Sequence, residues 1–89
     1  MRFVDTSGWY AAYVATDPSH AEVATLVDNA ETRLVTSDFV LAESLNLLRA
    51  RNEHQRAIRL GRDLLAEGPA TLVHVTPEDL EQAFIVFST

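Results

Sequence analysis

The stretch that decides the fold is residues 33–51, which read RLVTSDFVLAESLNLLRAR. Residues 33–36 form a short segment around the apolar pair Leu34 and Val35, which is typical of a strand. Ser37 or Asp38 can then cap a helix over residues 39–51, whose apolar residues occupy nearly every side of a helical wheel. A short strand that leads directly into a buried helix is one half of a crossover unit. The stretch therefore predicts an α/β fold.

The rest of the chain repeats this alternation. Further strands are expected over residues 2–5 and 71–75, and further helices over residues 9–13, 17–30, 57–65 and 76–87. Pro18 and Pro77 each stand at the first turn of an expected helix, directly after a residue that can cap it. Strands separated by helices indicate crossovers and a parallel sheet. We therefore predict a single α/β domain over residues 1–89.

The composition excludes several classes of function. The chain has 89 residues, of which 47% are hydrophobic, and this suits one globular domain. It has no cysteine, which excludes disulfide scaffolds, thiolate zinc sites and a cysteine nucleophile. Asp5 interrupts the only apolar stretch near the start, and the apolar run 83–87 is too short to cross a bilayer. We therefore predict a cytoplasmic protein that makes no membrane contact.

The charge is unevenly distributed along the chain. The net charge of −6 argues against a general coat for nucleic acid. Basic residues are nevertheless concentrated in one segment, which contains Arg49, Arg51, Arg56, Arg59 and Arg62. Such a segment suits contact with RNA phosphates or with an acidic partner protein. An ordinary solvated helix face with ion pairs is an equally good interpretation.

Two acidic residues stand where acids are not expected. Asp5 follows the apolar pair Phe3 and Val4 at the end of the first expected strand, and ligands of parallel sheets bind beyond such strand ends. Asp5 could instead cap the next helix, although Thr6 and Ser7 already offer hydroxyls for that purpose. The other acid lies within a helix that the wheel predicts to be buried.

Glu43 is this second acid, and it needs a positive partner if it is buried. A bound cation or one of the nearby arginines would serve, and the pattern slightly favours the cation. Asn46 lies one turn further on nearly the same face, where it could support the acid or make an ordinary buried hydrogen bond. The three histidines have no zinc-binding spacing.

Three segments resemble the motifs of PIN domains, in the correct order and over essentially the whole chain. Residues 3–7 (FVDTS) resemble a first motif in which a strand ends in aspartate followed by a small hydroxyl residue. Residues 36–46 (TSDFVLAESLN) resemble a second motif with glutamate in the helix after strand two. Residues 72–83 (LVHVTPEDLEQA) are similar to the third strand and the next helix. The resemblance implies a three-layer α/β/α fold with a short parallel sheet.

The resemblance also implies a function. Asp5 and Glu43 correspond to the first two acidic metal ligands of a family that cleaves RNA with Mg²⁺ or Mn²⁺. Thr6 would assist them by hydrogen bonding. Many members are VapC-type toxins that a partner antitoxin neutralises, so the resemblance implies an RNA substrate and an antitoxin partner.

The third acidic position of the family has no counterpart in these residues. The family carries a further aspartate after the helix that here ends near Phe87, usually followed by more strand and helix. We therefore expect a partial domain without the last strands and helix, with impaired or no nuclease activity. An uncovered sheet edge would favour a homodimer. The alternative is a non-catalytic interaction module that binds an antitoxin or a second copy of itself.

Overall fold

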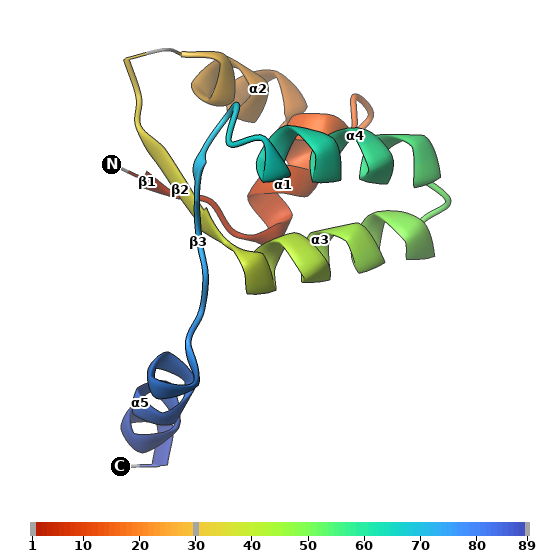
Figure 1. The fold of residues 1–89 in the computed structure, drawn as a ribbon. Helices are drawn as coiled ribbons and strands as arrows, with labels where there is room; N and C mark the ends of the chain where they lie inside the picture. Colours follow the sequence, from red (N-terminus) through yellow and green to blue (C-terminus); the bar gives the residue numbers. More distant parts are fainter. Residues whose placement is uncertain (1, 30, 89) are drawn as a thin grey trace.

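The computed structural model describes residues 2–29 and 31–88. The elements follow in the order β1 (Arg2–Phe3), α1 (Thr6–Tyr13), α2 (His20–Asp28), β2 (Leu34–Ser37), α3 (Asp38–Ala50), α4 (His54–Leu65), β3 (Thr71–Val73) and α5 (Pro77–Ser88) (Figure 1). Every predicted strand and helix is present. The part of the chain that the structure describes contains no helix of the length and hydropathy needed to span a membrane.

Two predicted boundaries need comment. The prediction that the second helix begins at Asp17 is wrong, because α2 begins at His20. The Asp17 carboxylate accepts a hydrogen bond from the Ser19 amide at 2.8 Å, so Asp17 and Pro18 form a turn before the helix. The predicted end of this helix at Ala30 lies outside the described residues.

The three strands form a parallel sheet in the order β1-β2-β3. Phe3 pairs with Val35, and Val35 pairs with Thr71. Both crossovers step in the same direction across the sheet, so right-handed connections place their helices on one face. Figure 1 shows α1, α3 and α4 together on that side. The predicted fold class, an α/β domain with a short parallel sheet, is confirmed.

The core lies between this face of the sheet and the helices. Trp9 of α1, Leu48 of α3 and Leu60 of α4 are fully buried in it. The Trp9 indole donates a hydrogen bond to the Thr36 hydroxyl at 3.0 Å, and this hydroxyl donates to the Val4 carbonyl at 3.0 Å. The buried polar groups of α1, β2 and the end of β1 are therefore satisfied by one another, which fixes the position of Asp5 relative to the sheet.

Helix α3 is not buried on every side, contrary to the prediction. It turns Leu41, Ser44 and Leu48 inward, whereas Phe39 is 63% exposed and Glu43 is also exposed. The helical wheel shows which residues share a face but not how many faces have neighbours. Glu43 therefore needs no buried positive partner.

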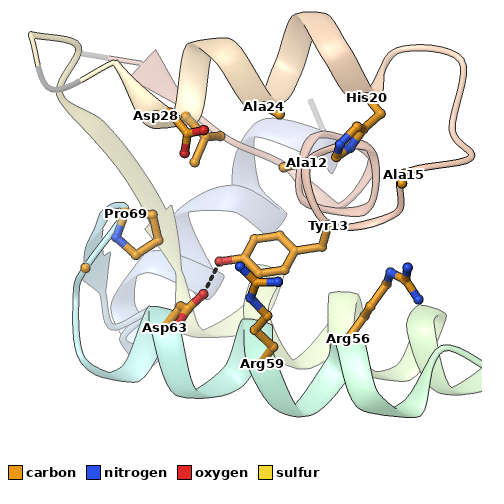
Figure 2. Close-up of a pocket in the computed structure, with 12 residues that line it drawn as sticks. Ala12, Tyr13, Ala15, His20, Ala24, Asp28, Arg56, Arg59, Asp63 and Pro69 are labelled. Carbon is orange, nitrogen blue, oxygen red and sulfur yellow. Dashed lines mark hydrogen bonds between the residues drawn. The ribbon is translucent and has the colours of Figure 1, made fainter.

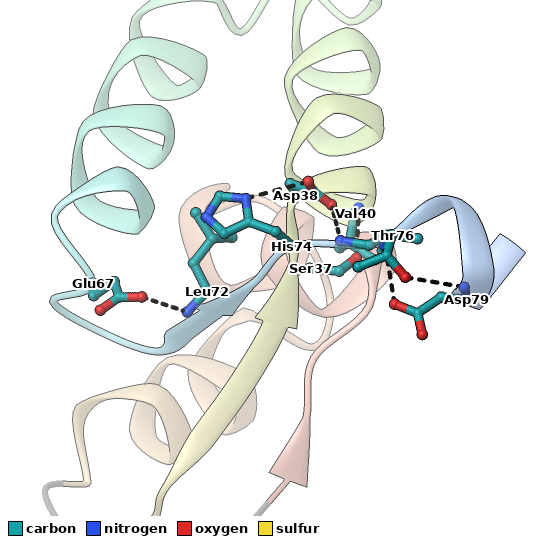
Figure 3. Close-up of polar contacts among 9 residues, drawn as sticks. Ser37, Asp38, Val40, Glu67, Leu72, His74, Thr76 and Asp79 are labelled. Carbon is teal, nitrogen blue, oxygen red and sulfur yellow. Dashed lines mark hydrogen bonds and ion pairs between the residues drawn. The ribbon is translucent and has the colours of Figure 1, made fainter.

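Helix α5 stands away from the other helices (Figure 1). The segment before it is held by Asp38, whose carboxylate accepts a hydrogen bond from the Val75 amide at 3.0 Å and lies 3.4 Å from His74 Nδ1 (Figure 3). Thr76 and Asp79 then cap the helix reciprocally, each side chain accepting from the other's amide. The start of α5 is therefore fixed, while the helix itself projects outward.

Candidate metal and RNA site

Asp5 lies at the carboxyl end of β1, where the chain turns into α1. It is the N-cap of α1: its Oδ1 accepts a hydrogen bond from the Gly8 amide at 3.0 Å and another from the Ser7 hydroxyl at 2.9 Å. The inference that Thr6 or Ser7 makes Asp5 redundant as a cap is therefore wrong. Both hydrogen bonds go to Oδ1, so the other carboxylate oxygen, Oδ2, remains available to bind a cation.

These hydrogen bonds favour the charged form of Asp5. The Gly8 amide, followed by the Ser7 hydroxyl, lowers the pKa of Asp5 below its ordinary value, while slight burial acts in the opposite direction. The positive end of the α1 dipole lies at the same place. Asp5 is therefore an exposed, ionised carboxylate at neutral pH, which is the state that a divalent cation requires.

Glu43 reaches the same place from α3. The Thr6 hydroxyl donates a hydrogen bond to Glu43 Oε1, across 37 positions of sequence. Thr6 directly follows Asp5 in the chain, so this contact brings the end of β1 and the middle of α3 together. The predicted residues Asp5, Thr6 and Glu43 thus belong to one neighbourhood, in which Thr6 connects the two acids.

The donor set suits a small hard cation. Carboxylate and hydroxyl oxygens are the ligands that Mg²⁺ and Mn²⁺ prefer, and Mg²⁺ commonly keeps several waters while one or two carboxylates bind it. Within residues 2–29 and 31–88, no cluster of three or more histidine, aspartate or glutamate side chains is placed to hold a metal. Asp5 and Glu43 therefore fit a hydrated ion with few protein ligands.

Asn46 lies further along α3. It is exposed and lines the groove between α3 and α4, and in the described part of the chain it makes no hydrogen bond with Glu43. The buried hydrogen bond expected for Asn46 is therefore not formed. Asn46 thus lines a hollow whose residues include neither Asp5 nor Glu43.

The five arginines do not form one surface. Arg49 and Arg62 line the groove between α3 and α4, whereas Arg56 and Arg59 line a pocket beside α1 and α2. Arg51 lies over the ring of Tyr10, with its guanidinium carbon 5.1 Å from the ring centre. The arginines that form one segment in the sequence therefore lie on different sides of α4, and their contact with RNA or a partner protein stays a prediction.

The pocket beside α1 and α2 has a volume of about 580 Å³ and was not foreseen from the sequence (Figure 2). On its wall the Tyr13 hydroxyl donates a hydrogen bond to Asp63 at 2.6 Å, and Arg59 lies 6.0 Å from the Tyr13 ring centre. Burial, followed by the contact with Asp63, raises the pKa of Tyr13, so this phenol stays protonated. Tyr13 ends the helix that Asp5 begins, so this pocket and the acids lie at opposite ends of α1.

Comparison with known proteins agrees with this arrangement. The PIN domain family matches residues 2–88. The crystal structure of Mycobacterium tuberculosis VapC20, described as a toxin that cleaves the sarcin–ricin loop, is similar at a TM-score of 0.86 and 30% sequence identity. That match covers 99% of this chain and 67% of VapC20. No curated protein sequence matches. The fold, the order of its elements and these matches together show that the chain belongs to the PIN domain family.

Proposed function

We propose that this chain is a metal-dependent endoribonuclease of the VapC type, in which Asp5 and Glu43 bind Mg²⁺ or Mn²⁺. The observation that carries the proposal is the hydrogen bond from Thr6 to Glu43, which joins the helix glutamate to the strand end that carries Asp5. The family match and the likeness to an RNA-cleaving toxin support the same reaction class.

Each residue has a separate task in this proposal. Asp5 is held ionised and fixed in direction by the first turn of α1, so it presents an oxygen ligand without reorganisation. Thr6 orients the Glu43 carboxylate by hydrogen bonding to one of its oxygens. A divalent cation supplies activation of a water and neutralisation of charge on the scissile phosphate when bound. The arginines that line the two hollows contact RNA phosphates or an acidic partner.

Two carboxylates suggest weak metal binding and slow cleavage. A third acidic ligand would add charge and would help to position a water, and the described residues place none beside Asp5 and Glu43. We therefore propose impaired activity for these residues. The family relationship also suggests an antitoxin protein as partner, and an RNA substrate and a cysteine-free chain both fit the cytoplasm.

RNA cleavage tests the proposal. The full chain is incubated with a labelled RNA that contains a sarcin–ricin-type stem-loop and with a single-stranded RNA, in Mg²⁺, in Mn²⁺ or in EDTA. We expect slow cleavage that requires the cation and is lost in Asp5→Asn and Glu43→Gln. Glu22→Gln, an exposed acid-to-amide change on α2, is the matched control and should cleave like the original chain. Cleavage that persists unchanged in both site variants would reject the assignment.

A non-catalytic interaction module is the second candidate function. It is favoured by the same observation that limits the first, namely that no third acid joins the two carboxylates in the described part of the chain. An absence of cleavage with either cation, together with a stable complex with a partner protein, would support this function over the nuclease.

A further inference from the structure

The pocket between α1, α2 and α4 lies outside the metal site of the proposed nuclease. Its volume of about 580 Å³ falls within the range of roughly 300–1,000 Å³ that is typical of pockets for small molecules. The residues that line it lie between positions 12 and 69 and include neither Asp5 nor Glu43. Figure 2 shows that three helices and the segment at Pro69 surround the hollow. It is therefore a candidate site for a small ligand, separate from the two acids.

Positive and negative side chains stand at opposite ends of this pocket. His20 begins α2 and Asp28 ends it, so their backbone positions are about 12 Å apart along the helix axis. On the facing wall, Arg56 lies near the start of α4 and Asp63 near its end. Figure 2 accordingly shows His20 and Arg56 at one end of the pocket, and Asp28 and Asp63 at the other. The pocket thus suits a molecule that is anionic at one end and donates hydrogen bonds at the other.

The charges needed for such a ligand are free to bind it. Within the described parts of the chain, neither Arg59 nor Asp28 takes part in an ion pair. Arg56 uses one terminal nitrogen for Glu53 at 2.8 Å, which leaves the other donors of its guanidinium group. Arg56, Arg59 and Asp28 are all exposed. Two arginines at one end and one carboxylate at the other are therefore available.

A fixed aromatic ring lies between the two ends. The Tyr13 hydroxyl donates to Asp63 at 2.6 Å, and the Trp9 ring meets the Tyr13 ring edge-on with 6.4 Å between their centres. Tyr13 is only partly buried, and the apolar side chains of Ala24 and Val27 line the pocket with it. Aromatic rings held in place are good platforms for nucleobases, because every base presents a flat face. The middle of the pocket therefore suits a planar group.

We infer that this pocket binds a nucleoside monophosphate whose base carries an amino group, with its phosphate at Arg56 and Arg59, its base beside Tyr13 and the amino group donating to Asp28. The planar guanidinium group matches phosphate oxygens well. An ionised carboxylate only accepts hydrogen bonds, so Asp28 favours the amino group of cytosine over the carbonyl oxygen that uracil has in its place. The inference does not depend on the nuclease proposal, since neither Asp5 nor Glu43 takes part.

Titration of the full chain with cytidine monophosphate, followed by calorimetry and by backbone amide signals, tests the inference. EDTA is present throughout, so that no divalent cation can hold the phosphate. We expect binding of one nucleotide per chain, with signal shifts centred on Tyr13, Ala24 and Gly68. Cytidine without phosphate should bind about tenfold more weakly or worse, and uridine monophosphate should bind several-fold more weakly than cytidine monophosphate.

Substitutions at the two ends should have different effects. Arg59→Gln should weaken binding of both nucleotides about tenfold, because a charge-assisted contact with phosphate is lost. Asp28→Asn should instead remove the preference for cytidine monophosphate over uridine monophosphate, because an amide can either donate or accept. Arg62→Gln, the same change on the opposite side of α4, is the matched control and should bind like the original chain. Far-UV circular dichroism checks that these exposed substitutions leave the chain folded.

Asp5→Asn and Glu43→Gln should bind cytidine monophosphate unchanged, so failure of the nuclease proposal and failure of this inference are distinguishable. Absence of binding by both nucleotides at millimolar concentration would overturn the inference. Signal shifts centred on Asp5 and Glu43 would overturn it as well. Equal affinity for cytidine monophosphate and inorganic phosphate would also overturn it, because the pocket would then recognise only an anion.

Discussion

Asp5 has a structural and a chemical role at the scale of single residues, and two substitutions separate them. Alanine removes the cap of α1 together with the charge, so Asp5→Ala should lower the free energy of unfolding by about 1 kcal/mol. Asparagine caps helices about as well as aspartate, so Asp5→Asn should change stability much less. Urea unfolding of the three chains at pH 7 measures both effects.

The pH dependence of the same variants follows from the direction of the pKa shift. Folding lowers the pKa of Asp5, so ionisation of this carboxyl stabilises the native state at pH values above its ordinary pKa of 3.8. This contribution disappears as the pH falls through the lower pKa of the folded state. The stability difference between the original chain and Asp5→Asn should therefore narrow below about pH 4. A constant difference from pH 7 to pH 3 would show that the cap does not act through charge.

The residue pattern selected these residues individually, whereas their contact was implied only by the resemblance to PIN domains. Asp5 after an apolar strand and Glu43 in a helix could be selected from the pattern alone. The hydrogen bond between Thr6 and Glu43 joins residues 37 positions apart, so it follows from how α1 and α3 pack together and not from any local pattern. The exposure of Glu43 was missed for the same reason.

At the scale of elements, two glycines in helices should respond oppositely to the same substitution. A Cβ on Gly8 would lie 2.8 Å from Val4 Cγ1, whereas a Cβ on Gly61 would meet Leu45 Cδ2 at an ordinary 3.5 Å. Gly8→Ala should therefore destabilise, because overpacking costs about 1–3 kcal/mol and outweighs the gain in helix propensity. Gly61→Ala should stabilise by up to about 1 kcal/mol.

Denaturant midpoints of the two glycine variants check this prediction. Equal stabilisation by both substitutions would mean that α1 can shift away from the end of β1, and the fixed position of Asp5 would be lost with it. The close approach explains why the chain carries glycine in the first turn of α1. The sequence around Gly8 does not predict this close approach to Val4.

The sequence predicted the type of each element correctly, but it predicted where the elements begin and end less accurately. Short apolar runs, caps and prolines located every strand and helix, because these signals act within a few residues. The start of α2 was placed too early because Asp17 can either cap a helix or form a turn through the Ser19 amide, and sequence does not distinguish the two.

At the scale of the whole molecule, the distribution of charge is the feature that sequence represented least accurately. Arginines that seem to form one segment divide between a groove on one side of α4 and a pocket on the other. The acids, by contrast, converge from two distant elements on one end of the sheet. The proposed function therefore depends on whether the Asp5 and Glu43 carboxylates together bind a cation.

Mn²⁺ titration of the full chain, followed by paramagnetic broadening of backbone amide signals, tests this claim most directly. We predict broadening centred on Asp5, Gly8 and Glu43, which should be abolished by Asp5→Asn and by Glu43→Gln and retained in Glu22→Gln. Broadening elsewhere in the molecule, or unchanged broadening in both site variants, would contradict the claim that the two carboxylates form a metal site.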